Sequence, residues 1–305
     1  MNIQFEAFRY LDYILQKNTG FKALLCDQET LKYISVAMTS TELYKNEVYL
    51  VDELPLFVRR SKVPEVESFS CICILRPTTE NINLIITELE KPHFPKYNLY
   101  FTSSISDEQI RDLGNHDSQA LINDLQEVYI DFSALGTRLF SLNIFDIVDF
   151  RNNPTYINYS ARIVEGLYAA ICSLQLKPII RYDCNSNVSK EVATKLSELV
   201  QTNSDLFGGH NVDSTLVLIL DRRNDPVTPL LHIFNYYSTI HDLFTIDNNV
   251  VKVGGKEYPI DERNDPNAEK LGTLFLEDAG IEISNHIEAV NKTLRELEDA
   301  KLGTM

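Results

Sequence analysis

Short apolar runs separated by segments that suit helices are the feature that most limits how this chain folds. Such runs recur through the first part of the sequence and are rich in branched side chains, as in buried strands. Their alternation with helical segments is typical of a parallel sheet with helices on both faces. The sequence therefore predicts a five-stranded α/β domain over residues 1–133, with strands at Lys22–Cys26, Val48–Val51, Cys71–Leu75, Leu99–Thr102 and Val128–Phe132.

A helix is predicted before the first strand, over residues 3–17. Its apolar residues recur at helical spacing, and Gly20 ends the segment. The residues that we expect on its core-facing side are Phe5, Phe8, Leu11, Ile14 and Leu15.

Two further regions follow, and each has its own pattern. The second region contains two amphipathic segments and two apolar runs, which predicts a second α/β domain that is incomplete. The third begins with a hairpin that turns at Gly254 and Gly255 and ends in an acidic amphipathic helix. The predicted domains are 1–133, 134–245 and 246–305; their elements include helices at 155–174, 186–200 and 281–302, strands at 179–182 and 216–220, and a hairpin at 250–260.

The charge of the chain disfavours two classes of partner. The sequence has 44 acidic and 28 basic residues, a formal net charge of −16 at pH 7. Nucleic-acid binding depends on patches of lysine and arginine, and so does adhesion to anionic membranes. No apolar run approaches the roughly 20 residues that span a bilayer, and the amino terminus lacks the apolar core of a signal peptide. We therefore expect a cytoplasmic protein that binds neither nucleic acid nor membrane directly.

The five cysteines and the glycines give no sign of a metal or a cofactor. Cys26, Cys71 and Cys73 fall in predicted strands, where buried reduced thiols are common. The C-x-C pair at 71 and 73 has no second pair to complete a zinc site. No GxxxxGK or GxGxxG loop follows any predicted strand, so a nucleotide site is not indicated. We expect no metal and no cofactor.

The polar residues that follow the run at 216–220 are the first place to look for catalysis. In open α/β sheets ligands bind beyond the carboxyl ends of the strands, so Asp221 and Asp225 are candidates for an acid and base pair or a metal site. However, Arg222 and Arg223 would keep both carboxylates ionised, and Asp221 could instead tie the turn. A doubly wound hydrolase stays an alternative hypothesis; its strand-end acids would be Asp27, Asp52 and Asp221.

Three stretches resemble the SM (Sec/Munc-type) family of syntaxin-binding proteins. The longest is LVLILDRRNDPVTPLLHIFNYYSTIHDLF at 216–244; the others are RPTTENINLIITEL at 76–89 and KPIIRYD at 177–183. In this family the stretch that corresponds to 216–244 has a structural role, which favours a structural role for Asp221 and Asp225. The resemblance covers nearly all of this chain but only the amino-terminal part of the family, whose proteins continue through a helical arch and return to complete the second sheet.

The resemblance implies a function in membrane fusion. It predicts a non-enzymatic monomer that binds a syntaxin-type SNARE and regulates assembly of the SNARE complex in vesicle docking and fusion. The branch of the family that it resembles most implies transport from the Golgi to endosomes or the vacuole, with membrane association through the SNARE partner. An inactive scaffold that lacks the rest of the family's fold is a further hypothesis.

The resemblance also implies two sets of contact residues. In the family a pocket on the outside of the first domain takes the amino-terminal peptide of syntaxin, and a cleft near the first two strands meets the folded syntaxin. An isoleucine stands at position 110, where the family often has an aromatic residue. The alternative is that these apolar residues form the inward stripes of two amphipathic helices. The pocket positions are Ile105, Ile110, Leu121, Ile122, Leu125 and Glu127, and the cleft positions are Lys32 and Asp52.

Overall fold

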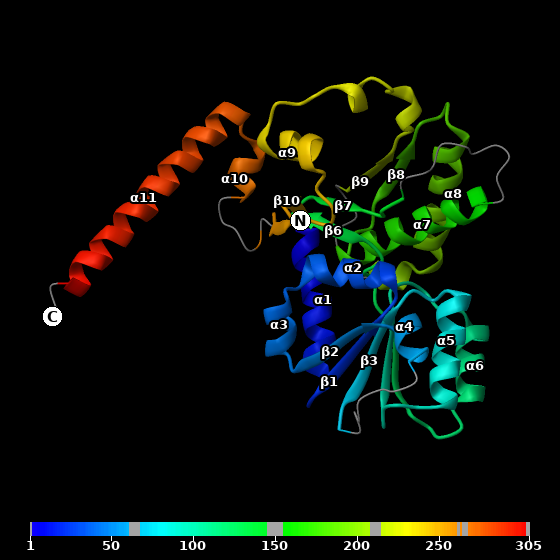
Figure 1. Ribbon diagram of the computed structural model, residues 1–305. Coiled ribbons are helices and arrows are strands. Elements are labelled where there is room, and N and C mark those ends of the chain that lie inside the picture. Colours follow the sequence, from blue (N-terminus) through cyan, green and yellow to red (C-terminus); the bar gives the residue numbers. More distant parts are fainter. Residues whose placement is uncertain are drawn as a thin grey trace. The chain divides into compact units, whose positions relative to one another are not determined.

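The structure, a computed structural model of the 305-residue chain, describes residues 2–60, 68–144, 155–207, 215–260, 263 and 268–302. It divides the chain into two compact units, residues 1–222 and 223–305, and each is described by itself. Figure 1 shows the helices and strands of both units.

The first unit contains the five-stranded parallel sheet that the sequence predicts, and this confirms the fold class (Figure 1). The strand order is β2-β1-β3-β4-β5, so β2 and β5 are the edges. Every residue of the inner strands β1 and β4 is buried. The strands are β1 Lys22–Cys26, β2 Val48–Glu53, β3 Ser70–Leu75, β4 Tyr97–Phe101 and β5 Ile122–Glu127.

Helices cover both faces of this sheet. Side chains from α1, α2 and α7 pack with Leu24 and Ile72 on one face. Side chains from α4, α5 and α6 pack with Leu25 and Cys73 on the other. Because successive side chains of a strand point to opposite faces, the inner strands supply both cores. The helices are α1 Ile3–Lys17, α2 Gln28–Ala37, α3 Ser40–Lys45, α4 Leu54–Val58, α5 Thr79–Glu90, α6 Asp107–His116 and α7 Thr155–Ser173.

Helix α1 has the predicted bounds, but one of its predicted core residues is wrong. Phe5 is 53% exposed, whereas Ile3 and Ala7 are buried beside Leu11. The helix begins at the Asn2 cap, whose side chain accepts a hydrogen bond from the Phe5 N–H. The buried stripe therefore runs through Ile3, Ala7 and Leu11, and Phe5 lies outside it.

The edge strand β5 lies before the strand that the sequence predicts there. The prediction of a strand at 128–132 is wrong, since β5 is Ile122–Glu127. Val128, Ile130 and Phe132 are buried, but they belong to the segment that leads from the sheet into a small antiparallel pair. An edge strand needs few apolar residues, so the apolar run follows β5 instead of coinciding with it. The small pair is β6 Ser133–Gly136 and β7 Leu139–Ser141.

The rest of the first unit is a two-stranded parallel sheet with helices on one face. Ile180, Val217 and Ile219 pack against α7 and α8. On the other face, Leu216 and Leu218 are more than half exposed. The predicted strand at 216–220 is thus buried on one side only. These elements are β8 Ile179–Tyr182, α8 Asn187–Thr202 and β9 Leu216–Ile219, with short 3-10 turns at Ser204–Phe207 and Arg222–Asn224.

The second unit consists of three helices and a hairpin in the residues that the structure describes. Its first helix follows Asn235, whose side chain caps the helix by accepting from the Ser238 N–H. The hairpin turns at Gly254 and Gly255, whose φ values of 58° and 78° suit the two-residue turn that the sequence predicts. The elements are α9 Tyr236–Phe244, β10 Val250–Val253, β11 Lys256–Pro259, α10 Ala268–Thr273 and α11 Leu276–Leu302, after a 3-10 turn at Thr228–Leu230.

Candidate partner-binding surface

The acid after β1 has a structural role. The Asp27 carboxylate accepts hydrogen bonds from the N–H groups of Thr30 and Arg76 and from the side-chain amide of Asn81, each at 2.8 Å. It thereby caps α2 and ties the end of β1 to the turn that follows β3. A carboxylate held by several donors is poorly placed to act as a base.

The other strand-end acids are also engaged. Asp52 forms an ion pair with Arg60 at 2.6 Å. Asp221 accepts a 2.6 Å hydrogen bond from Ser186, the cap of α8, and Asp225 accepts from the Thr228 N–H. Among the residues that the structure describes, no group of three or more His, Cys, Asp or Glu side chains is placed to hold a metal ion. The hydrolase hypothesis therefore gains no support from these acids.

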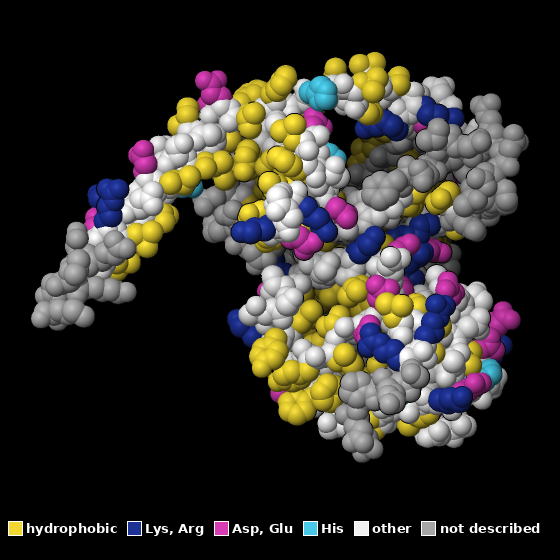
Figure 2. All heavy atoms as spheres, in the orientation of Figure 1, with side chains coloured by type: hydrophobic (Ala, Val, Ile, Leu, Met, Phe, Trp, Pro, Cys, Tyr) yellow, Lys and Arg dark blue, Asp and Glu magenta, His cyan; other side chains and the backbone are white. Residues whose placement is uncertain are grey.

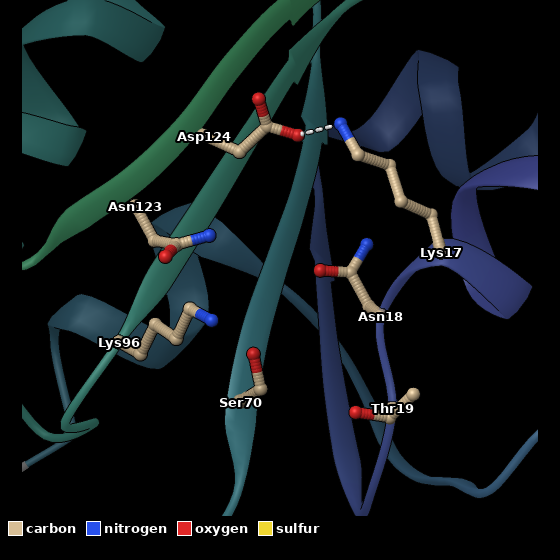
Figure 3. A pocket seen from close by; sticks show the side chains of 7 residues that line it. All are labelled: Lys17, Asn18, Thr19, Ser70, Lys96, Asn123 and Asp124. Carbon is tan, nitrogen blue, oxygen red and sulfur yellow. Dashed lines mark hydrogen bonds and ion pairs between the residues drawn. The ribbon is translucent and has the colours of Figure 1, made fainter.

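Two polar cavities lie at the opposite ends of the strands of the five-stranded sheet. The larger, about 960 Å³, is at the carboxyl ends of the strands and is lined by Arg76, Arg162 and Glu165, among others. The smaller, about 370 Å³, is at the amino ends, where Lys17 pairs with Asp124 (Figure 3). Small-molecule sites are mostly apolar with a few polar groups, and neither cavity has that character.

A buried ion cluster borders the larger cavity. Asp131 has no exposed surface, and its carboxylate lies 3.0 Å from Arg162 Nη1 and 3.2 Å from Arg76 Nε. Arg162 also donates to the Tyr33 hydroxyl at 2.7 Å. Because Arg162 is on α7 and Arg76 follows β3, the cluster fastens α7 to the sheet. Burial raises the pKa of Asp131 to about 7, although the two guanidinium groups lower it.

The predicted pocket residues lie on, or just before, helix α6 and strand β5, so the alternative of two helical stripes is wrong. Ile110 lies on α6 and is 40% exposed, whereas Ile105 lies before α6 and is 8% exposed. Leu121, Ile122 and Leu125 are partly buried on the α6 side of the sheet, at and within the edge strand β5. We call Ile105, Ile110, Leu121, Ile122, Leu125 and Glu127 the α6–β5 surface.

Hydrogen bonds fix the orientation of α6 above the sheet. Gln109 donates to the Pro77 carbonyl, at the start of α5, and Leu113 points into the core. Asp117, just after the helix, accepts from the N–H groups of Leu121 and Ile122. One flank of α6 therefore faces α5, and Ile110 lies on the other flank. In Figure 1, α6 is the outermost helix of its layer.

Glu127 holds this surface together. Its carboxylate accepts from the Ile105 N–H at 2.8 Å and from the Tyr129 hydroxyl at 3.1 Å. Burial and this carboxylate raise the pKa of Tyr129, so the phenol keeps its proton. Glu127 is exposed, and it joins the end of β5 to the start of the loop before α6.

The two predicted cleft residues both lie near the carboxyl edge of the sheet. Lys32 is exposed on α2, which follows β1. Asp52 is beside Leu25 in the parallel pairing of β1 with β2, and its side chain is only 11% exposed because it pairs with Arg60. Lys32 is thus available to a partner, whereas Asp52 already has one within the chain.

The family is decided by a comparison of the whole sequence with protein-family models. The Sec1 family model matches residues 22–303. The chain belongs to the Sec1 family. This confirms the resemblance drawn from the stretches at 76–89, 177–183 and 216–244, which lie within the matched range.

Known members of the family named vacuolar protein sorting-associated protein 45 are similar to this chain. The Dictyostelium discoideum and Homo sapiens proteins are both 34% identical to it, over 83% and 82% of the chain and 44% and 43% of their own lengths. The Rattus norvegicus protein is 32% identical over the full chain and 54% of its own length. The chain thus spans about half the length of these relatives.

Solved structures of the family share the fold. The structure titled as SM protein Vps45 in complex with Qa SNARE Tlg2 (1-310) has a TM-score of 0.88 and 29% identity, over 97% of this chain and 55% of that one. Sly1p in complex with an N-terminal peptide of Sed5p has a TM-score of 0.80 at 22% identity, over 97% of this chain and 54% of that one, and shows the fold alone. No helix among the described residues has the length and apolar character to span a membrane.

Three residues that hold this part of the structure together have no assigned role in the sequence analysis. These residues are Asp117, Tyr129 and Asp131. An acid inside an apolar run, as in VYIDF at 128–132, is the available signal for Asp131, because an unpaired buried carboxylate is costly and implies a cationic partner. The identity of that partner, Arg162, depends on the packing of α7 and has no local signal.

Proposed function

We propose that this chain is a non-enzymatic regulator of SNARE assembly that binds a syntaxin-type Qa SNARE. Family membership supports this, together with a solved complex of Vps45 with the Qa SNARE Tlg2 at 29% identity. The names of its relatives describe protein sorting and transport, and none describes a catalytic activity. The process would be vesicle docking and fusion between Golgi and endosomal or vacuolar membranes, which the protein would reach through its SNARE partner.

We further propose that the α6–β5 surface takes the amino-terminal peptide of the syntaxin. The observations that carry this are the 40% exposure of Ile110 on α6 and the partly buried apolar residues at the edge strand β5, which follows α6 in the chain. A residue that served only the core would be buried, as Leu113 is on the same helix. Small apolar sockets with a polar rim are the usual anchor sites of short peptides.

Glu127 would contribute by shaping the surface and by its charge. Its carboxylate is held by Ile105 and Tyr129, and it is exposed at the rim. A basic residue of the peptide would gain a charge-assisted bond to an acceptor that is already oriented.

The first prediction tests this surface with Ile110→Arg. Because Ile110 is 40% exposed, the charged side chain reaches water and the fold is kept, while the apolar contact with the peptide is lost. We expect about tenfold weaker binding or more in a calorimetric titration with a synthetic amino-terminal peptide of Tlg2. Glu127→Arg should also weaken binding.

The matched control is Asn115→Arg. It places the same charge on α6, on the side away from the core, where Asn115 is exposed. We expect this variant to bind like the parent chain. Parent affinity in a folded Ile110→Arg variant would exclude the α6–β5 surface as the peptide site.

A further inference from the structure

The seven residues that line the smaller cavity all have polar side chains. They lie at the amino ends of the strands and in the turn that follows α1. Figure 3 shows the Lys96 ammonium, the Asn123 amide and the hydroxyls of Ser70 and Thr19 directed toward one shared space. A largely apolar ligand would find no complementary wall there. The ligand that fits this cavity is therefore polar or charged.

A buried asparagine orients two of these side chains. Asn98 lies in the inner strand β4 and has no exposed surface. It donates to Ser70 Oγ at 2.9 Å, and its amide oxygen accepts from Asn123 Nδ2 at 2.8 Å. A polar side chain in the middle of a sheet is costly unless such bonds are made, and both of these bonds go to the cavity wall. Asn98 thus fixes where Ser70 and Asn123 point.

The hydrogen-bonding capacity that the wall leaves for a ligand consists mostly of donors. Ser70 Oγ accepts from Asn98, so its own hydrogen is left for a ligand, and Asn123 keeps one amide hydrogen after its bond to Asn98. In the part of the chain that the structure describes, the Lys96 ammonium and the Thr19 hydroxyl have no hydrogen-bond or ion-pair partner. Four donors, one of them a cation, therefore face the same space.

The acid that lines the cavity, Asp124, is already neutralised. It forms an ion pair with Lys17, and it accepts hydrogen bonds from the Tyr100 hydroxyl at 3.1 Å and from the Gln126 amide at 3.3 Å (Figure 3). The ion pair adds no net charge to the cavity, so the positive charge comes from Lys96. A cation surrounded by neutral donors is the arrangement that suits a charged oxyanion.

We propose that this cavity binds the phosphate group of a small, soluble, hydroxylated compound of the sugar phosphate or inositol phosphate class. The four donors suit the oxygens of a phosphate monoester. The volume of about 370 Å³ lies within the range of about 300–1,000 Å³ of small-molecule sites, so there is room for the part of the molecule that carries the phosphate. Hydroxyls of that part donate to the amide oxygens that Asn18 and Asn123 leave free.

The charge of the chain favours a soluble compound over a membrane lipid as the source of the phosphate. A net charge of −16 disfavours approach to an anionic bilayer, whereas a single small anion meets mainly the local charge of Lys96. The inference is independent of the proposed binding of a SNARE, which concerns other residues.

Lys96→Met tests the cavity because it removes the charge and keeps the length of the side chain. Lys96 is exposed, so the variant should melt like the parent chain. We expect its affinity for inositol monophosphate to fall about tenfold or more, the loss of one charge-assisted bond. Ser70→Ala removes one neutral donor and should weaken binding several-fold. The matched control is Lys91→Met, which removes the same charge from an exposed position between α5 and β4, outside the cavity lining, and should bind like the parent.

The measurement is a calorimetric titration of the whole chain with inositol monophosphate, inorganic phosphate and unphosphorylated inositol. We expect inositol monophosphate to bind most tightly, inorganic phosphate more weakly because it lacks the hydroxylated part, and inositol not at all. Binding should weaken as salt is raised. Thermal melting shows that each variant is folded.

Four results would overturn the inference. The first is no saturation by inositol monophosphate up to about 10 mM. The second is an equal loss of affinity in Lys91→Met and Lys96→Met, because the total charge would then control binding. The third is equal affinity for inorganic phosphate and inositol monophosphate, which would remove the hydroxylated part from the site. The fourth is binding only to phosphatidylcholine vesicles that contain phosphatidylinositol phosphate, and not to the soluble compound.

Discussion

Asp131 shows how one buried side chain makes the stability of the first unit depend on pH. Burial raises its pKa from 3.8 to about 7; the guanidinium groups of Arg162 and Arg76 lower it, and the carboxylates of Glu165 and Glu29 raise it. Because this pKa is higher in the folded chain than in the unfolded chain, the folded state binds more protons between these two values. The contribution of Asp131 to stability is therefore complete below about pH 4 and is lost as the pH rises through about 7.

Asp131→Asn removes this dependence, because an amide has no proton to lose. We expect the stability of the parent, relative to that of the variant, to fall between about pH 4 and about pH 7, by up to about 4 kcal/mol, the difference that corresponds to the two pKa values. Urea unfolding of both proteins across this range measures it. For Asp205→Asn, which changes an exposed acid, the difference should stay constant. A constant difference for Asp131→Asn would show that its pKa is close to the unfolded value.

At the scale of single residues, the sequence predicts what is local and misses what depends on packing. The hairpin turn at Gly254 and Gly255 follows from neighbours in the chain and is confirmed. Phe5 is exposed although it is aromatic, because the contacts of α1 with the sheet decide which face is buried. The pairing of Asp131 with Arg162 joins residues 31 positions apart.

At the scale of elements, the strand prediction holds at the inner strand β1 and fails at the edge strand β5. The inner strand β1, KALLC, is apolar after Lys22 and has the predicted bounds, Lys22–Cys26. The edge strand β5, INDLQE, carries polar residues, so the apolar run after it is the stronger signal in the sequence. The alternative of two amphipathic helices fails here, because residues 122–127 form a strand.

Helix α11 leaves an apolar stripe open to solvent. Ile287, Val290, Leu294 and Leu297 are each more than half exposed, and their alternating spacing of three and four residues is that of a coiled-coil seam. Figure 2 shows hydrophobic side chains in a row along this helix. Such a stripe favours pairing with another helix.

We predict weak self-association of the chain through this stripe. Val290→Lys places a charge in the seam and should lower the association constant about tenfold, as measured by sedimentation at several protein concentrations. Ala289→Lys introduces the same charge at the adjacent exposed position, outside the seam, and should have little effect. Equal effects of the two substitutions would mean that charge, and not the stripe, controls association.

At the scale of the whole molecule, the comparisons establish more than the pattern of elements does. Alternating strands and helices give an α/β fold, which many unrelated functions share. The family became evident from long stretches such as 216–244, where the individual residues carry the resemblance. The division into domains at 133 and 245 stays a prediction, and the structure separates two compact units at residues 222 and 223.

Binding of a folded syntaxin to the whole chain provides a further prediction. We propose that Lys32 contacts this partner in the cleft, and Lys32→Glu should then weaken binding several-fold without lowering the melting temperature, because Lys32 is exposed on α2. Asp52→Lys is less informative, since it also breaks the ion pair with Arg60. Titration of the parent and of Lys32→Glu with the soluble part of Tlg2 measures the effect. An unchanged affinity would remove Lys32 from the proposed contact.

The open face of the β8–β9 pair determines how the protein responds to heat. Leu216, Leu218 and Ile179 are exposed there on neighbouring parallel strands, and Leu220 follows them. Molecules that partly unfold on warming will expose more apolar surface. We expect them to aggregate before they can refold. The apparent melting temperature will therefore rise with the heating rate, and a half-life at fixed temperature will describe the durability of this protein better than an equilibrium midpoint does.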